Sequence, residues 1–297
     1  MLRSLVAEIN VEPFMDQYLA QYGPLPSLET LVWQIFGNQT SESLGFLGKN
    51  PQIQKLDLPY AAEADFLDQS LLPLLSKSFG SLRSLRLAWQ DPHISTRALE
   101  SISSITSLQQ LCLSAGEQFG WRTNWRINHK ELRKYLAKLP HLKKLALRRD
   151  SYPERTPDPD DEGDEASNEI AVDHYYDSNH APQDEIESLL QSTVMRSLHT
   201  NAGDGEYMHN AQIALRRVNE LVHRRRMLLE AGKYAKTLKK LEWIYIGQLP
   251  MVVTESLWGG GHAISRRAMA LTDERDSCYS LLKRIFGADD AKFEVVK

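Results

Sequence analysis

The chain has 297 residues and a formal net charge of −4, with 42% hydrophobic residues, which is enough for a sizeable core. Its two cysteines exclude a disulfide framework, and no apolar run is long enough for a membrane span. The amino-terminal residues lack the long apolar run of a signal peptide. We therefore expect a cytoplasmic or nuclear protein with no membrane partner.

One short pattern recurs along the chain: apolar, two residues, apolar, one residue, apolar. Its copies start at residues 28, 53, 82, 108, 142 and 238, and a degenerate copy starts at residue 2. Counted from the degenerate copy at residue 2, the first four gaps between starts are 26, 25, 29 and 26 residues, which is the interval of leucine-rich repeats. The alternative is an ordinary α/β domain with Leu-rich strands, but such a fold has no reason for regular spacing.

Helix-forming segments lie between the copies. Residues 65–78 are rich in Leu, although Pro73 should kink or shorten a helix there. Ser95 is a suitable N-cap for a helix that continues through Ile102. These features predict a repeating unit of helix, turn and short strand.

A capping box indicates the last helix before the long gap. Asn128 is followed three residues later by Glu131, which predicts a helix over residues 130–139. Parallel strands would then stack, and the helices would cover the convex side, because no unit can bury its own apolar face. Only the degenerate first copy has the usual ladder Asn, at Asn10. We therefore predict an α/β fold, an irregular leucine-rich-repeat horseshoe solenoid.

A strongly acidic insertion separates the last two copies. Residues 150–187 contain 14 acidic residues and one basic residue, a net charge of −13, whereas the rest of the chain carries +9. High charge and repeated Pro predict disorder. Residues 158–169 approach the calcium-loop template, but their flanks are Pro-rich instead of helical. We interpret them as a solvated acidic loop.

A basic helix is predicted after this insertion, from about residue 205 to residue 231, with Gly232 as its break. Its arginines favour an acidic surface or nucleic acid. No zinc-ligand spacing, aromatic RNA-binding motif or helix-turn-helix signal accompanies them. We do not expect nucleic acid as the partner, and a solvated helix face near the chain's own acidic loop is the preferred interpretation. The arginines are Arg216, Arg217, Arg224, Arg225 and Arg226.

The end of the chain is predicted to form a cap. Two β-prone runs around residues 259–261 indicate a hairpin, and Thr272 is a suitable N-cap for a helix to about residue 286. Together they would shield the last repeat. The predicted organisation is 1–149 repeat array, 150–204 acidic and mostly disordered insertion, 205–250 basic helix and final repeat, and 251–297 hairpin–helix cap.

Candidate catalytic residues are few. Asp173, His174, Asp177 and His180 could ligate a metal, but a predicted disordered loop would not hold them at fixed distances. Cys112 lies in a predicted strand with no base positioned beside it. We therefore expect no enzyme activity, no metal and no cofactor.

The strand alternation predicts a binding surface. If the apolar residues of each copy point inward, the residues between them point outward and line the concave side. This row is mixed polar with scattered basic residues, which favours a non-catalytic protein–protein interaction scaffold; the alternative is that these are only solvated strand residues. The predicted partner-binding residues are Gln34, Lys55, Asp57, Arg86, Gln110, Lys144, Arg148, Lys240 and Glu242.

The carboxyl-terminal region adds a family resemblance. Residues 241–251, Arg266-Arg267 and residues 271–287, together with the repeats, resemble filamentous-fungal F-box/leucine-rich-repeat-type proteins. The resemblance covers most of the chain except the acidic insertion. It implies substrate reception in a cullin-RING ubiquitin ligase, in which an F-box docks an adaptor and the repeats hold a target.

The chain departs from this family in having no evident F-box. We therefore expect a target-binding module related to F-box receptors, with an unidentified protein partner and without binding of the ligase adaptor. The alternatives are a truncated F-box protein without an independent role and a nucleic-acid-associated protein that uses the basic helix.

Overall fold

The computed structural model describes most of the chain outside the predicted acidic insertion and the predicted terminal helix. The described residues exclude that insertion with its calcium-like loop. They also exclude Gln34 and the helix expected over residues 272–286. The described residues are 2–7, 21, 24–33, 41–116, 125, 127–148, 221–222, 224–247, 249–258 and 263–270.

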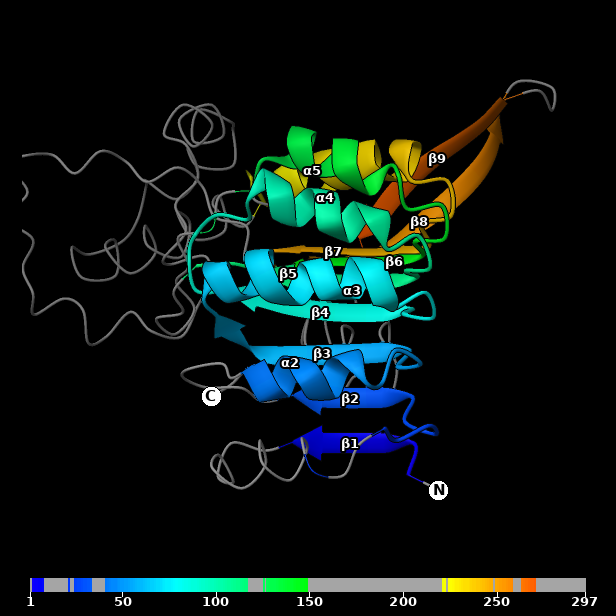
Figure 1. Cartoon of the computed structure of the whole chain (residues 1–297). Helices are drawn as coiled ribbons and strands as arrows, with labels where there is room; N and C mark the ends of the chain where they lie inside the picture. The colour runs from blue at the N-terminus through cyan, green and yellow to red at the C-terminus, as the bar shows by residue number, and fades with distance from the viewer. Residues whose placement is uncertain are drawn as a thin grey trace, which may run out of the picture.

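The described strands form one mixed sheet of nine strands that follow one another in chain order and do not close into a barrel (Figure 1). Strands β1 to β7 pair in parallel, as predicted, whereas β7, β8 and β9 pair antiparallel. The strands are β1 Ser4–Ala7, β2 Thr30–Trp33, β3 Lys55–Ala62, β4 Ser84–Trp89, β5 Gln110–Ser114, β6 Lys144–Arg148, β7 Trp243–Gly247, β8 Leu249–Trp258 and β9 Ala263–Ala270.

Helices cover one face of this sheet (Figure 1). Each lies in the connection between consecutive parallel strands, which is the helix–turn–strand unit that the sequence predicts. The face that they cover is here named the helix face, and the opposite side of the sheet is named the second face. The helices are α2 Ser41–Gly48, the π-helical segment η2 Phe66–Leu71, α3 Leu72–Ser78, α4 Thr96–Ser104, α5 His129–Leu136, and an unlabelled helix over residues 221–222 and 224–237.

The predicted helix starts are confirmed. The Ser95 hydroxyl accepts a hydrogen bond of 3.0 Å from the backbone N–H of Ala98, at the start of α4. Asn128 accepts one of 3.2 Å from the N–H of Glu131 in α5. Pro73 stands in the first turn of α3, directly after the π-helical segment η2, and the chain stays helical through it. These signals are local in sequence, which is why they could be predicted.

The break expected at Gly232 is wrong, because the helix continues through this residue to residue 237. A glycine costs a helix only about 1 kcal/mol relative to alanine. Ala231, Tyr234 and Ala235 are fully buried on the inner side of the helix. Their burial outweighs the glycine penalty.

The core is a stack of apolar residues on the helix face of the sheet. Leu56 pairs in register with Leu85, Leu85 with Leu111, and Leu111 with Leu145. Each is at most 1% exposed. Burying one such side chain contributes about 1.5–3 kcal/mol. The stack therefore stabilises each unit through its neighbours.

A repeated turn leads into each of the strands β2 to β7. The first apolar residue of the unit donates its backbone N–H to the carbonyl oxygen three residues earlier. This turn aligns the units more finely than the apolar pattern does. The donor and acceptor pairs are Leu28 to Leu25, Ile53 to Asn50, Leu82 to Phe79, Leu108 to Ile105, Leu142 to Leu139, and Leu241 to Leu238.

This turn shows that the last repeat begins three residues later than the apolar pattern predicted. Leu241, and not Leu238, occupies the first apolar position, and Leu238 is the equivalent of Leu139. The pairing agrees, since Leu145 lies beside Ile244 and Leu147 beside Ile246. Isoleucines thus fill the inward positions of β7.

The predicted hairpin is confirmed as β8 and β9, which pair from Met251 with Ala270 to Trp258 with Ala263. It extends the sheet beyond the last parallel strand (Figure 1). Within the described residues, no helix is both long and apolar enough to cross a membrane.

Candidate functional site

The first residues of six consecutive parallel strands form a row along the second face. This strand-start row runs through the paired residues of β2 to β7, and every member is partly exposed. Three of the predicted binding residues, Lys55, Gln110 and Lys144, belong to it. The full row is Thr30, Lys55, Ser84, Gln110, Lys144 and Trp243.

Three other predicted residues are buried, although exposure on an open surface was expected. Asp57, Arg86 and Arg148 are 2%, 4% and 7% exposed. Asp57 and Arg86 lie on neighbouring strands, with Arg86 Nη1 3.5 Å from Asp57 Oδ1. Buried charges require an opposite charge or hydrogen bonds, and each of these two supplies the other's charge. They face each other inside the middle of the sheet and are not displayed to solvent.

Lys240 and Glu242 do not lie on the predicted row, because the last repeat begins three residues later than the sequence suggested. Both precede β7. The Lys240 ammonium lies 3.1 Å from His141 Nδ1, and the Glu242 carboxylate forms an exposed ion pair of 3.0 Å with Lys143. Trp243 takes the place on the row. The Leu-x-x-Ile-x-Ile pattern at 241–246 was the signal that could have indicated this register.

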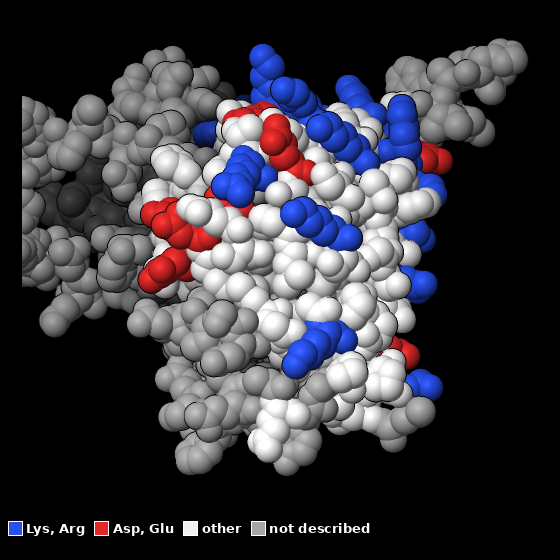
Figure 2. Space-filling model, viewed as in Figure 1, with Lys and Arg blue, Asp and Glu red and all other residues white. Residues whose placement is uncertain are grey.

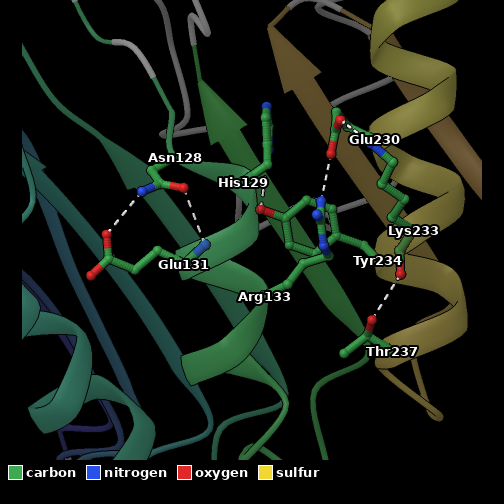
Figure 3. Close-up of polar contacts among 8 residues, drawn as sticks. All are labelled: Asn128, His129, Glu131, Arg133, Glu230, Lys233, Tyr234 and Thr237. Carbon is green, nitrogen blue, oxygen red and sulfur yellow. Dashed lines mark hydrogen bonds and ion pairs between the residues drawn. The ribbon is translucent and has the colours of Figure 1, made fainter.

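A polar cluster joins α5 to the helix over 224–237 (Figure 3). The Tyr234 hydroxyl lies 3.2 Å from His129 Nδ1, and both side chains are buried. The Arg133 guanidinium lies over the Tyr234 ring, 5.4 Å from its centre, which is within the range of a cation–π interaction. These residues are about a hundred positions apart, so no local pattern indicated the cluster.

Glu230 occupies the centre of the charged part of this cluster. One carboxylate oxygen accepts a hydrogen bond of 2.5 Å from Arg133, and the other accepts one of 2.6 Å from Lys233 (Figure 3). Burial raises the pKa of Glu230, but the hydrogen bonds from Lys233 and Arg133, together with attraction to neighbouring positive charge, outweigh this effect, so its net pKa lies below the ordinary value. Glu230 is therefore ionised at neutral pH and holds the two helices together.

Basic residues gather around the cluster. Residues 127–148 and 224–247 together contain 14 Lys and Arg but only three Glu. Figure 2 shows Lys and Arg spread over the upper part of the molecule, where α5 and the following helix lie. The three acidic residues all have polar partners, since the Glu131 carboxylate accepts a hydrogen bond from the Asn128 amide, Glu230 binds Arg133, and Glu242 binds Lys143. The region therefore keeps a strong positive charge.

Among the described residues, no three His, Cys, Asp or Glu side chains come together as a metal-binding group. Cys112 is buried in β5, and Asp173, His174, Asp177 and His180 lie outside the described residues. What the described surface offers is a row of partly exposed strand residues and a cationic helix surface.

No protein-family model matches this chain, and no curated protein is similar enough to count as a match.

Proposed function

We propose that this chain is a non-catalytic protein–protein interaction scaffold of the leucine-rich-repeat type, and that it binds its partner along the strand-start row, because the same-face residues two positions further along these strands are buried. The strand-start row carries this proposal. It places six side chains in register on six consecutive parallel strands, and all six are partly exposed.

The row suits a protein partner for physical reasons. Neighbouring strands lie about 4.8 Å apart, so six strands present side chains along roughly 25 Å of surface. Thr30, Ser84 and Gln110 offer neutral hydrogen-bonding groups, and Lys55 and Lys144 add positive charge. Trp243 ends the row with an aromatic side chain of the type that dominates binding energy at protein interfaces.

The family resemblance suggests what kind of protein the partner is. In F-box/leucine-rich-repeat proteins the repeats hold the target of a ubiquitin ligase, and we extend this role to the chain as a target-binding module related to those receptors. Its compartment in this proposal is the cytoplasm or the nucleus. The repeat register supports the binding role, whereas ligase recruitment would require an F-box.

Blocking the row tests the scaffold role. Ser84→Arg combined with Gln110→Arg places two long side chains at its centre, on the adjacent strands β4 and β5. The matched control is Ser78→Arg with Ser104→Arg, since both serines are exposed at the ends of α3 and α4. Affinity capture from cell extracts and mass spectrometry would compare the partners of the wild type and both variants.

The expected result is that one or more stoichiometric partners are lost with the row variant and kept with the control. Circular dichroism and thermal unfolding must show that both variants fold. Capture that the folded row variant leaves unchanged would reject the second face as the binding surface. Copurification of a cullin-RING adaptor would show that the chain also recruits a ligase.

A further inference from the structure

The helix over 221–222 and 224–237 carries two leucines that are exposed instead of packed. Leu221 is 56% exposed and Leu229 is 60% exposed. The same helix buries Val222, Met227 and Tyr234 on its inner side. The helix therefore has apolar residues on the side that faces the core and also on the side that faces solvent. Core packing does not explain the solvent-facing leucines.

Charge alternates with these leucines along the helix. Leu221, Arg225, Leu229 and Lys233 are four residues apart, which places them one above another on one side of a helix. We name these four residues the docking stripe. The stripe presents leucine, cation, leucine, cation over about three helical turns, with its second cation, Lys233, paired to Glu230.

A second line of cations runs along α5 and its end. Lys130, Lys134 and Lys138 are also four residues apart, and all three are exposed. The polar cluster holds α5 beside the helix with the docking stripe (Figure 3). Among the described residues, no acidic side chain forms an ion pair with these three lysines or with Arg225. The ammonium groups of Lys134 and Lys138 lie over the Tyr135 ring, 5.4 and 5.2 Å from its centre, so a partner's carboxylates would approach these cations without displacing an acidic side chain.

The chemistry of the stripe distinguishes between two kinds of acidic partner. A phosphate backbone would use the cations but would gain nothing from Leu221 and Leu229. An acidic helix with leucines on one side would use both the cations and the exposed leucines. Its carboxylates would reach the cations, and its leucines would cover Leu221 and Leu229. Helices bind amphipathic helices in this way, through apolar residues at helical spacing with charges at their border.

We propose that the docking stripe binds an acidic amphipathic helix of a partner protein. The partner's leucines pack on Leu221 and Leu229, and its Glu or Asp side chains pair with Arg225 and with the lysines of α5. This site lies on the helix layer, away from the strand-start row. It is therefore a second interaction surface, and it does not depend on the proposed function of the row.

Three probes test the proposal with the full chain. The first is a short fluorescent helical peptide with leucines along one side and glutamates elsewhere. The second has the same glutamates but serine in place of each leucine, and the third is a single-stranded DNA oligonucleotide of similar charge. Fluorescence anisotropy at physiological ionic strength would measure the affinity for each.

The expected result is that the leucine–glutamate peptide binds about tenfold more tightly than the serine–glutamate peptide, since covering an exposed leucine is worth about this factor. Leu229→Ser should reduce this preference, because only Leu221 then remains to be covered, without changing the weak binding of the serine peptide. Arg225→Glu should weaken the binding of both peptides several-fold. Met269→Ser and Lys77→Glu are the matched controls, since Met269 is 45% exposed on β9 and Lys77 is exposed on α3.

Two results would overturn the proposal. One is that the two peptides bind equally or not at all, because the leucines would then make no contribution. The other is that the oligonucleotide binds more tightly than either peptide, with a steep salt dependence and no effect of Leu229→Ser, which would identify a nucleic-acid surface. Circular dichroism of each variant excludes unfolding as the cause of lost binding.

Discussion

Arg133 and Glu230 form an ion pair between residues that are 97 positions apart, and their side chains are only 16% and 14% exposed. The pair joins α5, which precedes the long gap between repeats, to the helix that follows it. The chain between them includes the whole acidic insertion. The pair therefore helps to bring the last repeat back onto the array.

Removing this pair should destabilise the protein. We expect Arg133→Ala to cost about 2–3 kcal/mol of unfolding free energy, because Glu230 keeps a partly buried charge and the cation–π contact with Tyr234 is lost. A double-mutant cycle with Glu230→Gln, measured by urea unfolding, should give a coupling energy of about 1–2 kcal/mol. Lys130→Ala, on the exposed side of α5, should change stability by less than about 0.5 kcal/mol. Additive single effects would show that the two side chains do not interact.

The same carboxylate predicts a pH dependence. The pKa of Glu230 is lowered in the folded protein from 4.5, so the folded state favours the ionised form. This contribution to stability is fully present above pH 4.5 and is lost as the pH falls through the lower folded pKa. The stability difference between wild type and Glu230→Gln should therefore be largest near neutral pH and should shrink in acid. Urea unfolding midpoints of both proteins, measured across this pH range, would test this. A stability difference that does not change with pH would contradict the lowered pKa of Glu230.

Arg266 should be required for docking the β8–β9 hairpin. From β9 its guanidinium donates to three backbone carbonyls, those of Ala235, Leu238 and Leu241, where the helix ends and β7 begins. Positive charge and hydrogen-bond donors stabilise a helix C-terminus. Arg266→Ala should cost about 2–3 kcal/mol and increase hydrogen exchange in β9. Arg266→Lys should recover only part of this loss, because an ammonium lacks the planar fork.

Arg267 is the matched control for this prediction, since it neighbours Arg266 on β9 and is exposed. Arg267→Ala should leave both the stability and the exchange of β9 unchanged within error. Equal effects of the two substitutions would mean that general positive charge, and not the contacts with the carbonyls, holds the hairpin.

The register of the last repeat can be tested directly. Ile244 is 1% exposed and pairs with Leu145, so Ile244→Ala should cost about 2–5 kcal/mol through the cavity that it leaves. Glu242→Ala should cost less than about 0.5 kcal/mol, because its side chain is 51% exposed. Thermal or urea unfolding would measure both. The opposite ranking would restore the register that starts at Leu238.

Much of the architecture is readable from local sequence. The spacing of Leu56, Leu85 and Leu111 predicted parallel strands in chain order, because each unit carries the same apolar pattern and only its neighbours can bury it. Ser95 and Asn128 predicted helix starts, because a cap is a contact between residues three apart. Such features depend on short-range geometry.

What the sequence left undecided depends on contacts between distant residues. Two overlapping patterns, from Leu238 and from Leu241, fit the last repeat equally well, and pairing with β6 chose the second. The burial of Asp57 with Arg86 could not be predicted, because strand alternation gives the side of the sheet and not what it meets. Arg133, Glu230 and Tyr234 became a cluster only when the helices packed together. The sequence by itself determined the repeating unit, and the tertiary structure decided the register of its last copy and the partners of its charges.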